Sequence, residues 1–158
     1  MLRFRECNER DCTAWIKLNR AFMSEEINDN EFWHKADRIS DAEFRDVFLE
    51  GLKARDQVRF IIFEEDEEPV GFANLVLFFS VWGHGQCMII DDFFFKRGSR
   101  GQGRGRAGMH MVEEYAKSLG CKRLQLLSAP SNPGSMEFYK AIGYNPADMN
   151  FYIKYLDE

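Results

Sequence analysis

Apolar residues recur along the chain with two periods, which divide it into predicted helices and strands. Spacings of three and four residues predict helices over residues 10–22, 40–55, 107–119 and 135–142, with a weaker helical pattern over residues 28–36. Alternating or continuous apolar runs predict strands over residues 2–6, 58–64, 70–81, 87–95, 124–127 and 150–156. A β-α opening, an antiparallel meander and a strand-loop-helix-strand unit in this order are typical of a mixed α/β fold.

Local signals mark the ends of several elements. Ser40 and Glu43 have the Ser-x-x-Glu spacing of a capping box, in which each side chain binds the other residue's backbone N–H at a helix start. Gly120 and Gly143 each follow a predicted helix, where glycine adopts a left-handed conformation at low cost. Because the sequence contains no repeat, linker or low-complexity tract, we expect residues 1–158 to form one domain.

Composition and charge exclude several classes of protein. The apolar runs are short and interrupted by charges, so we expect no membrane association, and a net charge of −5 gives no electrostatic reason to bind nucleic acid. The four cysteines have neither CxxC spacing nor histidines at zinc-site spacing, so no metal site is expected. The charged, alternating N-terminal segment does not resemble a signal peptide, which predicts reduced thiols and a cytoplasmic location.

Residues 96–109 carry the clearest chemical signal. Five glycines and five basic residues lie between a predicted strand and a predicted helix. Glycines let a backbone approach a phosphate closely, the free N–H groups of a first helical turn attract it, and arginine adds forked donors. The segment therefore predicts an anion-binding cradle, with a solvent-exposed basic turn as the structural alternative.

Three other binding patterns fit this loop less well. Gly103, Gly105 and Gly108 have the spacing of a dinucleotide fingerprint, but no acidic residue follows about 20 residues later, where that site needs one. The Gly-Lys-Ser/Thr ending of a Walker loop is absent. An arginine-glycine RNA-binding segment is usually disordered and would act against the net negative charge.

The loop and its surroundings resemble those of the GCN5-related N-acetyltransferases (GNAT). Arg100, Gly103 and Gly105 match the motif R/Q-x-x-G-x-G/A, residues 91–95 resemble the family's fourth strand, and residues 132–144 resemble its asparagine and Phe-Tyr-x-x-x-Gly helix. The resemblance covers residues 87–144. It implies a GNAT fold, in which a twisted mixed sheet of about six to seven strands, with two central strands splayed apart, is flanked by about four helices.

The resemblance implies acetyl-CoA as the acyl donor. Backbone amides of residues 102–106 would bind the pyrophosphate, and the strand around Phe93 would pair with the pantetheine arm. Asn132 and Ser135 would contact the coenzyme or hold the loop, although both residue types are also common helix caps. The implied coenzyme site comprises Phe93, Phe94, Phe95, Arg100, Gly101, Gln102, Gly103, Arg104, Gly105, Arg106, Asn132, Ser135 and Tyr139.

The resemblance also assigns two catalytic roles. Tyr139 aligns with the tyrosine that protonates the leaving thiolate, and Asp91 stands where related enzymes place a carboxylate that takes the amine's proton. Strand alternation lets only one of Asp91 and Asp92 face the slot. We favour Asp91 as the base and assign Asp92 to substrate binding, although this choice stays open. A backbone amide near Phe93 would stabilise the oxyanion. The structural alternatives are a paired aspartate and an ordinary core tyrosine.

The acceptor site of this family lies around the first two helices, here about residues 22–33. Carboxylates among aromatic residues suit an ammonium group, so Glu25, Glu26, Asp29 and Trp33 predict a small cationic amine as acceptor. A solvated acidic face is the structural alternative. Two other functions stay open, namely a non-catalytic acyl-CoA sensor and a protein-modifying acetyltransferase. The sequence does not specify the oligomeric state, and a homodimer is left open.

Overall fold

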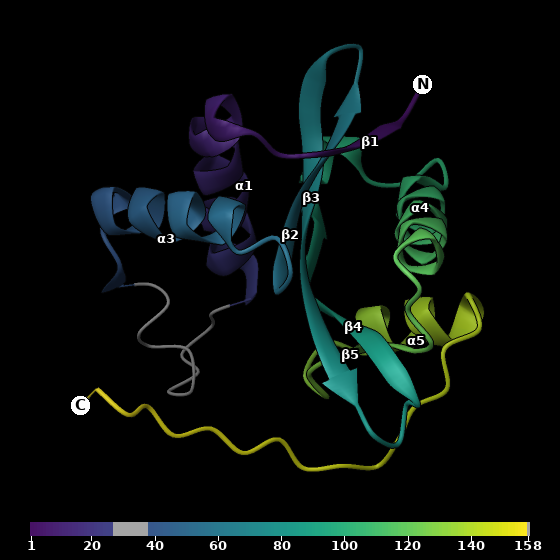
Figure 1. Ribbon diagram of the computed structural model, residues 1–158. Helices are drawn as coiled ribbons and strands as arrows, with labels where there is room; N and C mark the ends of the chain where they lie inside the picture. Colours follow the sequence, from purple (N-terminus) through teal and green to yellow (C-terminus); the bar gives the residue numbers. More distant parts are fainter. Residues whose placement is uncertain (27–37, 158) are drawn as a thin grey trace.

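A twisted five-stranded sheet forms the centre of the protein (Figure 1). The computed structural model describes residues 1–26 and 38–157, apart from the side chain of Glu26. Each strand lies beside the next in the chain, and only the last pair is parallel. The strands are β1 (Arg3–Glu6), β2 (Val58–Glu65), β3 (Glu68–Ser80), β4 (Gly85–Phe95) and β5 (Leu124–Leu126).

Helices cover both faces of the sheet, so the protein has three layers. One face carries α1 (Cys12–Glu26) and α3 (Asp41–Lys53), and the other carries α4 (Arg104–Ser118) and α5 (Pro133–Ala141) (Figure 1). Short 3-10 turns, η1 (Glu9–Asp11) and η3 (Arg97–Ser99), precede α1 and follow β4. This architecture confirms the mixed α/β class. Among the described residues, no helix has the length and apolar character needed to span a bilayer.

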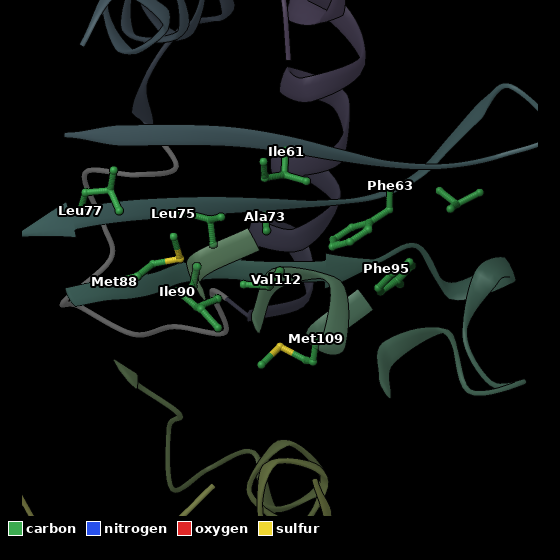
Figure 2. Close-up of a cluster of buried hydrophobic side chains, with 12 residues drawn as sticks. Ile61, Phe63, Ala73, Leu75, Leu77, Met88, Ile90, Phe95, Met109 and Val112 are labelled. Atoms are coloured by element: carbon green, nitrogen blue, oxygen red, sulfur yellow. The ribbon is translucent and has the colours of Figure 1, made fainter. Parts of the chain in front are cut away.

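The core divides into two clusters because alternate residues of each strand face opposite layers. Figure 2 shows the cluster under α4, where Met109 and Val112 pack on the sheet; its strand members include Ile61, Phe63, Ala73, Leu75, Met88, Ile90 and Phe95. The second cluster is aromatic and lies under α1 and α3; it includes Trp15, Phe44, Phe48, Phe72 and Phe94. The chain's many phenylalanines therefore fill both sides of the sheet.

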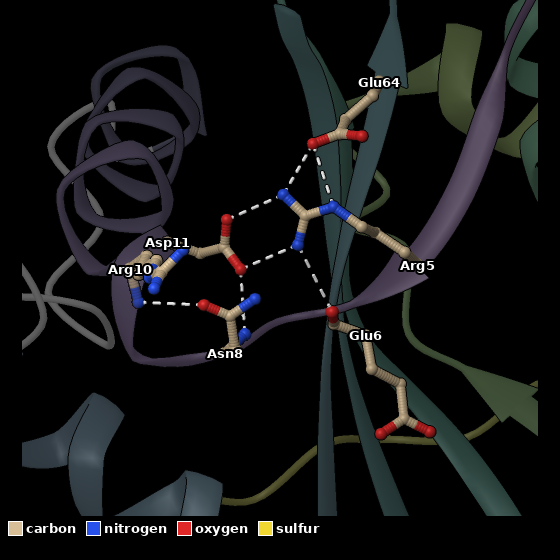
Figure 3. A network of polar contacts seen from close by, with 6 residues as sticks. All are labelled: Arg5, Glu6, Asn8, Arg10, Asp11 and Glu64. Carbon is tan, nitrogen blue, oxygen red and sulfur yellow. Dashed lines mark hydrogen bonds and ion pairs between the residues drawn. The ribbon is translucent and has the colours of Figure 1, made fainter. Parts of the chain in front are cut away.

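A polar network around Arg5 joins the N-terminal elements (Figure 3). The Arg5 guanidinium lies 2.7 Å from Asp11 of η1 and 2.5 Å from Glu64 of β2. Asn8 caps η1 by accepting the Arg10 N–H. These bonds hold β1, η1 and β2 together, and thereby set the point at which α1 leaves the sheet.

The predicted helix signals are formed as expected. Ser40 Oγ accepts the Glu43 N–H at 3.2 Å, and the Glu43 carboxylate accepts the Ser40 N–H at 2.8 Å, which completes the capping box. Gly120 and Gly143 have φ values of 75° and 98°. Helix α4 begins at Arg104, three residues before the predicted start. Its first turns include Gly105 and Gly108, although glycine disfavours a helix, because the rings of Phe138 and Phe95 pack directly against these positions.

The predicted closing strand over residues 150–156 is wrong. Among the described residues the sheet ends at β5 and has five strands, not six to seven. The chain instead leaves α5 through Gly143 and runs as an irregular segment beneath the sheet (Figure 1). The predicted helical stretch over residues 28–36 lies outside the described residues.

Gly71 provides a test of the packing that fixes the end of β4. A Cβ at Gly71 would lie 2.5 Å from the Phe94 backbone oxygen, whereas a Cβ at Gly98 would meet no atom within 4 Å. We expect Gly71→Ala to lower the free energy of unfolding by about 1–3 kcal/mol, because a backbone atom cannot move aside cheaply. Gly98→Ala should leave it nearly unchanged. Urea denaturation of both variants measures the difference, and equal stabilities would contradict this account.

Candidate active site

Strands β4 and β5 separate partway along their length. Residues 88–90 of β4 pair with residues 124–126 of β5, but β4 continues five residues further, to Phe95. In the described part of the chain, no strand covers the outer edge of residues 91–95. Because β5 ends at Leu126, β4 alone extends past it and has a backbone edge with hydrogen-bonding groups next to α4 and α5.

A β-bulge lies where the two strands separate. Asn74 of β3 faces Asp92, while Leu75 faces Ile90, so Asp91 is an extra residue in β4. The bulge changes which face the following side chains reach. Simple alternation across the two aspartates therefore does not decide which of them faces the slot.

The glycine-arginine loop makes a left-handed turn before α4. The residues of this turn, Gly101, Gln102 and Gly103, have φ values of 82°, 52° and 75°. Two of the three are glycines, which adopt this conformation without a Cβ penalty. The turn reverses the chain and brings the start of α4 beside the end of β4.

The N-terminus of α4 has no side-chain cap. Its N-cap residue, Gly103, makes no side-chain hydrogen bond, whereas Ser40 caps α3 and Asn132 caps α5. The Ala107 N–H reaches back to the Gly103 carbonyl at 2.9 Å, and the Arg104 N–H bonds to the Gly101 carbonyl at 3.2 Å. First-turn amides have no partner within their helix and carry the positive end of its dipole. This end of α4 is therefore suited to bind an anion through its backbone.

The arginine side chains of the loop are held by other groups. Arg104 donates two bonds to Glu65, at 2.6 and 2.9 Å. Arg100 donates to Glu25 at 2.5 Å and to the Phe95 carbonyl at 2.8 Å, and its guanidinium lies over the Phe94 ring. These contacts shape the loop, and they leave anion binding mainly to the backbone amides.

Helix α5 brings the predicted tyrosine to the same region. The Phe138 ring lies 3.2 Å from the position a Cβ would take at Gly105, so α5 packs against the first turn of α4. Tyr139 is half-buried, with its ring 5.1 Å from Phe138 and 5.9 Å from Tyr144. Asn132 accepts the Ser135 N–H at 3.1 Å, so Asn132 takes the capping role that was its structural alternative.

A partly buried polar network holds Asp92. The Asn74 amide donates to Asp92 at 2.7 Å and to Asn19 at 3.1 Å, while its oxygen accepts the Trp15 indole N–H at 2.9 Å. Asn19 donates to the Trp15 carbonyl at 2.8 Å, which closes the network within α1. The indole nitrogen is only a donor, so it fixes the orientation of the Asn74 amide and directs the NH₂ group at the carboxylate.

The two aspartates differ in their surroundings. Burial raises the pKa of Asp92 to about 6; the Asn74 bond opposes this shift and the Asp91 charge adds to it. Asp91 is an exposed residue at the bulge. Partial burial of its carboxyl by nearby residues still raises its pKa. A carboxyl with a raised pKa holds a proton more tightly, which suits a group that must accept one.

The structure brings most of the predicted residues together around the end of β4. Asp91, Asp92, the loop and the start of α4 are close in the fold, and α5 places Tyr139 beside α4. Glu25 contacts Arg97 and Arg100 of the loop. The Glu26 side chain, Asp29 and Trp33 lie outside the described residues.

Sequence reasoning missed two polar groups near this site. Asn74 carried a usable signal, because an amide within the apolar run of β3 needs a buried partner. Ser128 follows β5, and its Oγ is buried with no hydrogen-bond partner among the described residues. A serine just after a short strand gives no comparable signal in the sequence.

Comparisons with known proteins are consistent with this geometry. The model of the family described as Acetyltransferase (GNAT) matches residues 13–144. A thialysine N-epsilon-acetyltransferase from Bos taurus is 27% identical over 146 residues, which span 88% of this chain and 81% of the bovine protein.

Two solved structures have the same fold. A transcriptional regulator from Bacillus halodurans superposes with a TM-score of 0.80 at 21% identity, covering 98% of this chain and 100% of the regulator. The aminoglycoside N-acetyltransferase AAC(6')-Iy, solved with CoA, gives a TM-score of 0.76 at 16% identity, covering 99% of this chain and 95% of that one.

The raised pKa of Asp92 predicts a pH-dependent stability. Below about pH 4 the residue is protonated in both the folded and unfolded states and contributes nothing; between about pH 4 and pH 6 only the unfolded state ionises, so stability falls as pH rises. The shift corresponds to at most about 3 kcal/mol. Relative to the wild type, Asp92→Asn should therefore gain stability as pH rises from about 4 to 7.

Urea denaturation across this pH range measures the effect. The exposed Asp56→Asn serves as the matched control and should parallel the wild type at every pH. An Asp92→Asn variant that also runs parallel to the wild type would contradict a buried, hydrogen-bonded Asp92.

Proposed function

The chain belongs to the Acetyltransferase (GNAT) family, and from that premise we propose that it transfers an acetyl group from acetyl-CoA to a primary amine of a small cationic acceptor. The observation that carries the proposal is the uncapped start of α4 beside the open edge of β4. An anion-binding helix end and a free strand edge together match a ligand that has a pyrophosphate at one end and an amide-containing arm at the other.

The residues present fit acetyl-CoA. First-turn amides of α4 would hold the pyrophosphate, while the edge around Phe93 would bind the pantetheine amides as a neighbouring strand binds. The buried Ser128 Oγ, just beyond β5, would gain its missing hydrogen bond from the same arm. The coenzyme supplies the acetyl group as an activated thioester.

Asp91 is proposed as the base that deprotonates the amine. It lies at the bulge where β4 and β5 separate, and its carboxyl is exposed with a raised pKa. Asp92 already accepts the Asn74 amide at 2.7 Å, so it is better suited to hold the acceptor's positive charge. The neutral amine would attack the thioester carbonyl carbon and form the N–C bond, and its nitrogen would then lose a second proton to solvent. The C–S bond would break as Tyr139 protonates the departing sulfur.

Relatives support a small amine as acceptor. The bovine protein is named for acetylating the ε-amine of thialysine, and AAC(6')-Iy is named for acetylating aminoglycosides. Both acceptors carry ammonium groups at neutral pH, which agrees with two adjacent carboxyls at the proposed site. A non-catalytic sensor and a protein-modifying acetyltransferase are the competing functions. The thiol-release experiment below distinguishes each of them from the proposed reaction.

Thiol release from acetyl-CoA tests the reaction directly. With a panel of polyamines, aminoglycosides and lysine analogues, we expect turnover by the wild type and a fall in kcat of about 10²-fold or more in Tyr139→Phe and Asp91→Asn, since general acid and base groups contribute this much. Tyr152→Phe, in the exposed C-terminal segment, is the matched control and should retain full activity.

The outcomes separate the three functions. Coenzyme binding without thiol release for any amine would indicate the sensor, and label transfer to lysate proteins alone would indicate the protein-modifying enzyme. A larger loss in Asp92→Asn than in Asp91→Asn would reverse the two aspartate assignments.

A pair of substitutions at Arg106 separates backbone from side-chain binding. Arg106 is the third residue of α4, where its N–H lies in the first turn and a proline is tolerated. Arg106→Pro removes this N–H, whereas Arg106→Ala removes only the side chain. Because a hydrogen bond to a charged group contributes about 1.5–3 kcal/mol, we expect Arg106→Pro to weaken CoA binding about tenfold or more beyond Arg106→Ala.

Isothermal titration with CoA measures both affinities, and thermal melting checks that each variant is folded. Equal affinities in two folded variants would show that the amide does not bind the coenzyme.

A further inference from the structure

We propose that Asn74 is a positioning residue for the acceptor. It directs the Asp92 carboxylate at the acceptor's positive charge, and Trp15 and Asn19 of α1 hold Asn74 in the orientation that this requires. The inference rests on the proposed function and adds to it three residues that lie behind the reacting groups. Its support comes from the hydrogen bonds of the network, the face of the sheet on which they lie and the charges around Asp92.

Every polar group of the Asn74 side chain has a partner. Its two N–H groups donate to Asp92 at 2.7 Å and to Asn19 at 3.1 Å, and its oxygen accepts the Trp15 indole N–H at 2.9 Å. The indole nitrogen can only donate, so a flipped amide would set two donors against each other at Trp15 and two acceptors against each other at Asp92. One orientation of the amide is therefore favoured, and it directs an N–H at the carboxylate.

The two residues behind Asn74 are themselves fixed. Asn19 is 4% exposed, and its NH₂ group donates to the Trp15 carbonyl at 2.8 Å while its oxygen accepts from Asn74. Trp15 is 3% exposed, with its ring 5.2 Å from that of Phe44. Placing amides in an aromatic cluster is unfavourable unless they are hydrogen-bonded. Here the bonds that offset this cost form a chain that ends at Asp92.

The network lies on the face of the sheet that α1 covers. Asn74 is two residues after Phe72 in β3, and Asp92 is two residues before Phe94 in β4. Both phenylalanines belong to the aromatic cluster under α1 and α3. Because side chains two residues apart on a strand share a face, Asn74 and Asp92 point toward α1. The acceptor is expected on this side, so Asp92 is placed to meet it while Asn74 supports the carboxylate from β3.

The surroundings of Asp92 suit an ammonium group of a ligand. In the described part of the chain, β3 presents the uncharged Asn74 to it, α1 places the uncharged Trp15 and Asn19 behind that amide, and the charge that acts on it is that of Asp91. Burial raises the pKa of Asp92 to about 6, the Asn74 bond lowers it and Asp91 raises it further. Asn74 therefore helps to keep the carboxyl ionised at neutral pH.

Two amines of equal length test the inference. Cadaverine and pentylamine have the same carbon chain, but only cadaverine has a second amino group to bind at Asp92. Asn74→Leu keeps the approximate size of the side chain and removes its N–H groups. It should raise KM for cadaverine about tenfold at pH 7 and leave kcat within about twofold, because a hydrogen bond to a charged group is lost. For pentylamine, kcat/KM should change less than about twofold.

Two further variants separate the polar network from packing. Trp15→Phe retains a ring but loses the indole N–H, so it should raise KM for cadaverine in the same way, by a smaller factor. Phe44→Leu alters the ring that packs on Trp15 without touching the network, and as the matched control it should keep the wild-type KM. Thermal melting checks that each variant is folded, and Trp15→Phe carries the comparison if Asn74→Leu is not.

Carbon NMR of the Asp92 carboxyl measures the same effect in the free protein, without any reaction. The carboxyl should titrate at a higher pH in Asn74→Leu and Trp15→Phe than in the wild type, because the bond that lowers its pKa is lost or loosened. The pH below which KM for cadaverine rises should move upward with it. In the wild type, the Trp15 indole proton should exchange slowly with solvent, and its shift should follow the Asp92 titration.

The outcomes distinguish this inference from the proposed function. If the wild type acetylates both amines, and folded Asn74→Leu and Trp15→Phe keep the cadaverine KM and the Asp92 pKa, the inference alone is wrong. An equal rise in KM for cadaverine and pentylamine would also overturn it, because that result indicates general damage to the site. A wild type that releases no thiol with any amine would instead overturn the proposed function, and this inference with it.

Discussion

Strands β4 and β5 stop pairing at the bulge that Asp91 introduces, and the candidate site is arranged around that separation. The extra residue changes the face that Asp92 reaches, and β4 continues beyond the end of β5. An unpaired strand edge in the middle of a protein exposes backbone groups that need partners. Here the edge lies beside α4 and α5, so a ligand with amide groups would meet hydrogen-bonding partners along the open length of β4.

The polar network behind the bulge explains how a carboxyl is retained between two apolar clusters. An isolated buried carboxylate would be strongly unfavourable, and its raised pKa reflects that cost. Asn74 reduces the cost by donating to Asp92, and the Trp15 indole holds Asn74 in the orientation that permits it. The aromatic cluster under α1 therefore has a second role besides packing, because Trp15 links it to the position of Asp92.

Much of this arrangement could be predicted from the sequence. Periodicity located the helices and the strands of the sheet within a few residues, because each has one clear apolar face. The capping box and the helix-ending glycines, Gly120 and Gly143, are local signals and were also predicted correctly. The bulge, the Asn74 network and the Ser128 hydroxyl depend on register and on contacts between distant residues, which local patterns do not encode. The strand over residues 150–156 was inferred from a valid pattern, but a strand also requires an edge within reach.

Glu25 connects the two ends of the site. It lies near the end of α1, on the side where the acceptor is expected, and it binds Arg97 and Arg100 of the glycine-arginine loop. A carboxylate held there neutralises part of the loop's positive charge, so a diphosphate would be bound chiefly by directed amides and less by diffuse charge. Amides of a rigid helix start are fixed before the ligand arrives, whereas arginine side chains must lose conformational freedom to bind it. Holding those arginines in ion pairs therefore favours a ligand recognised by its shape over any simple polyanion.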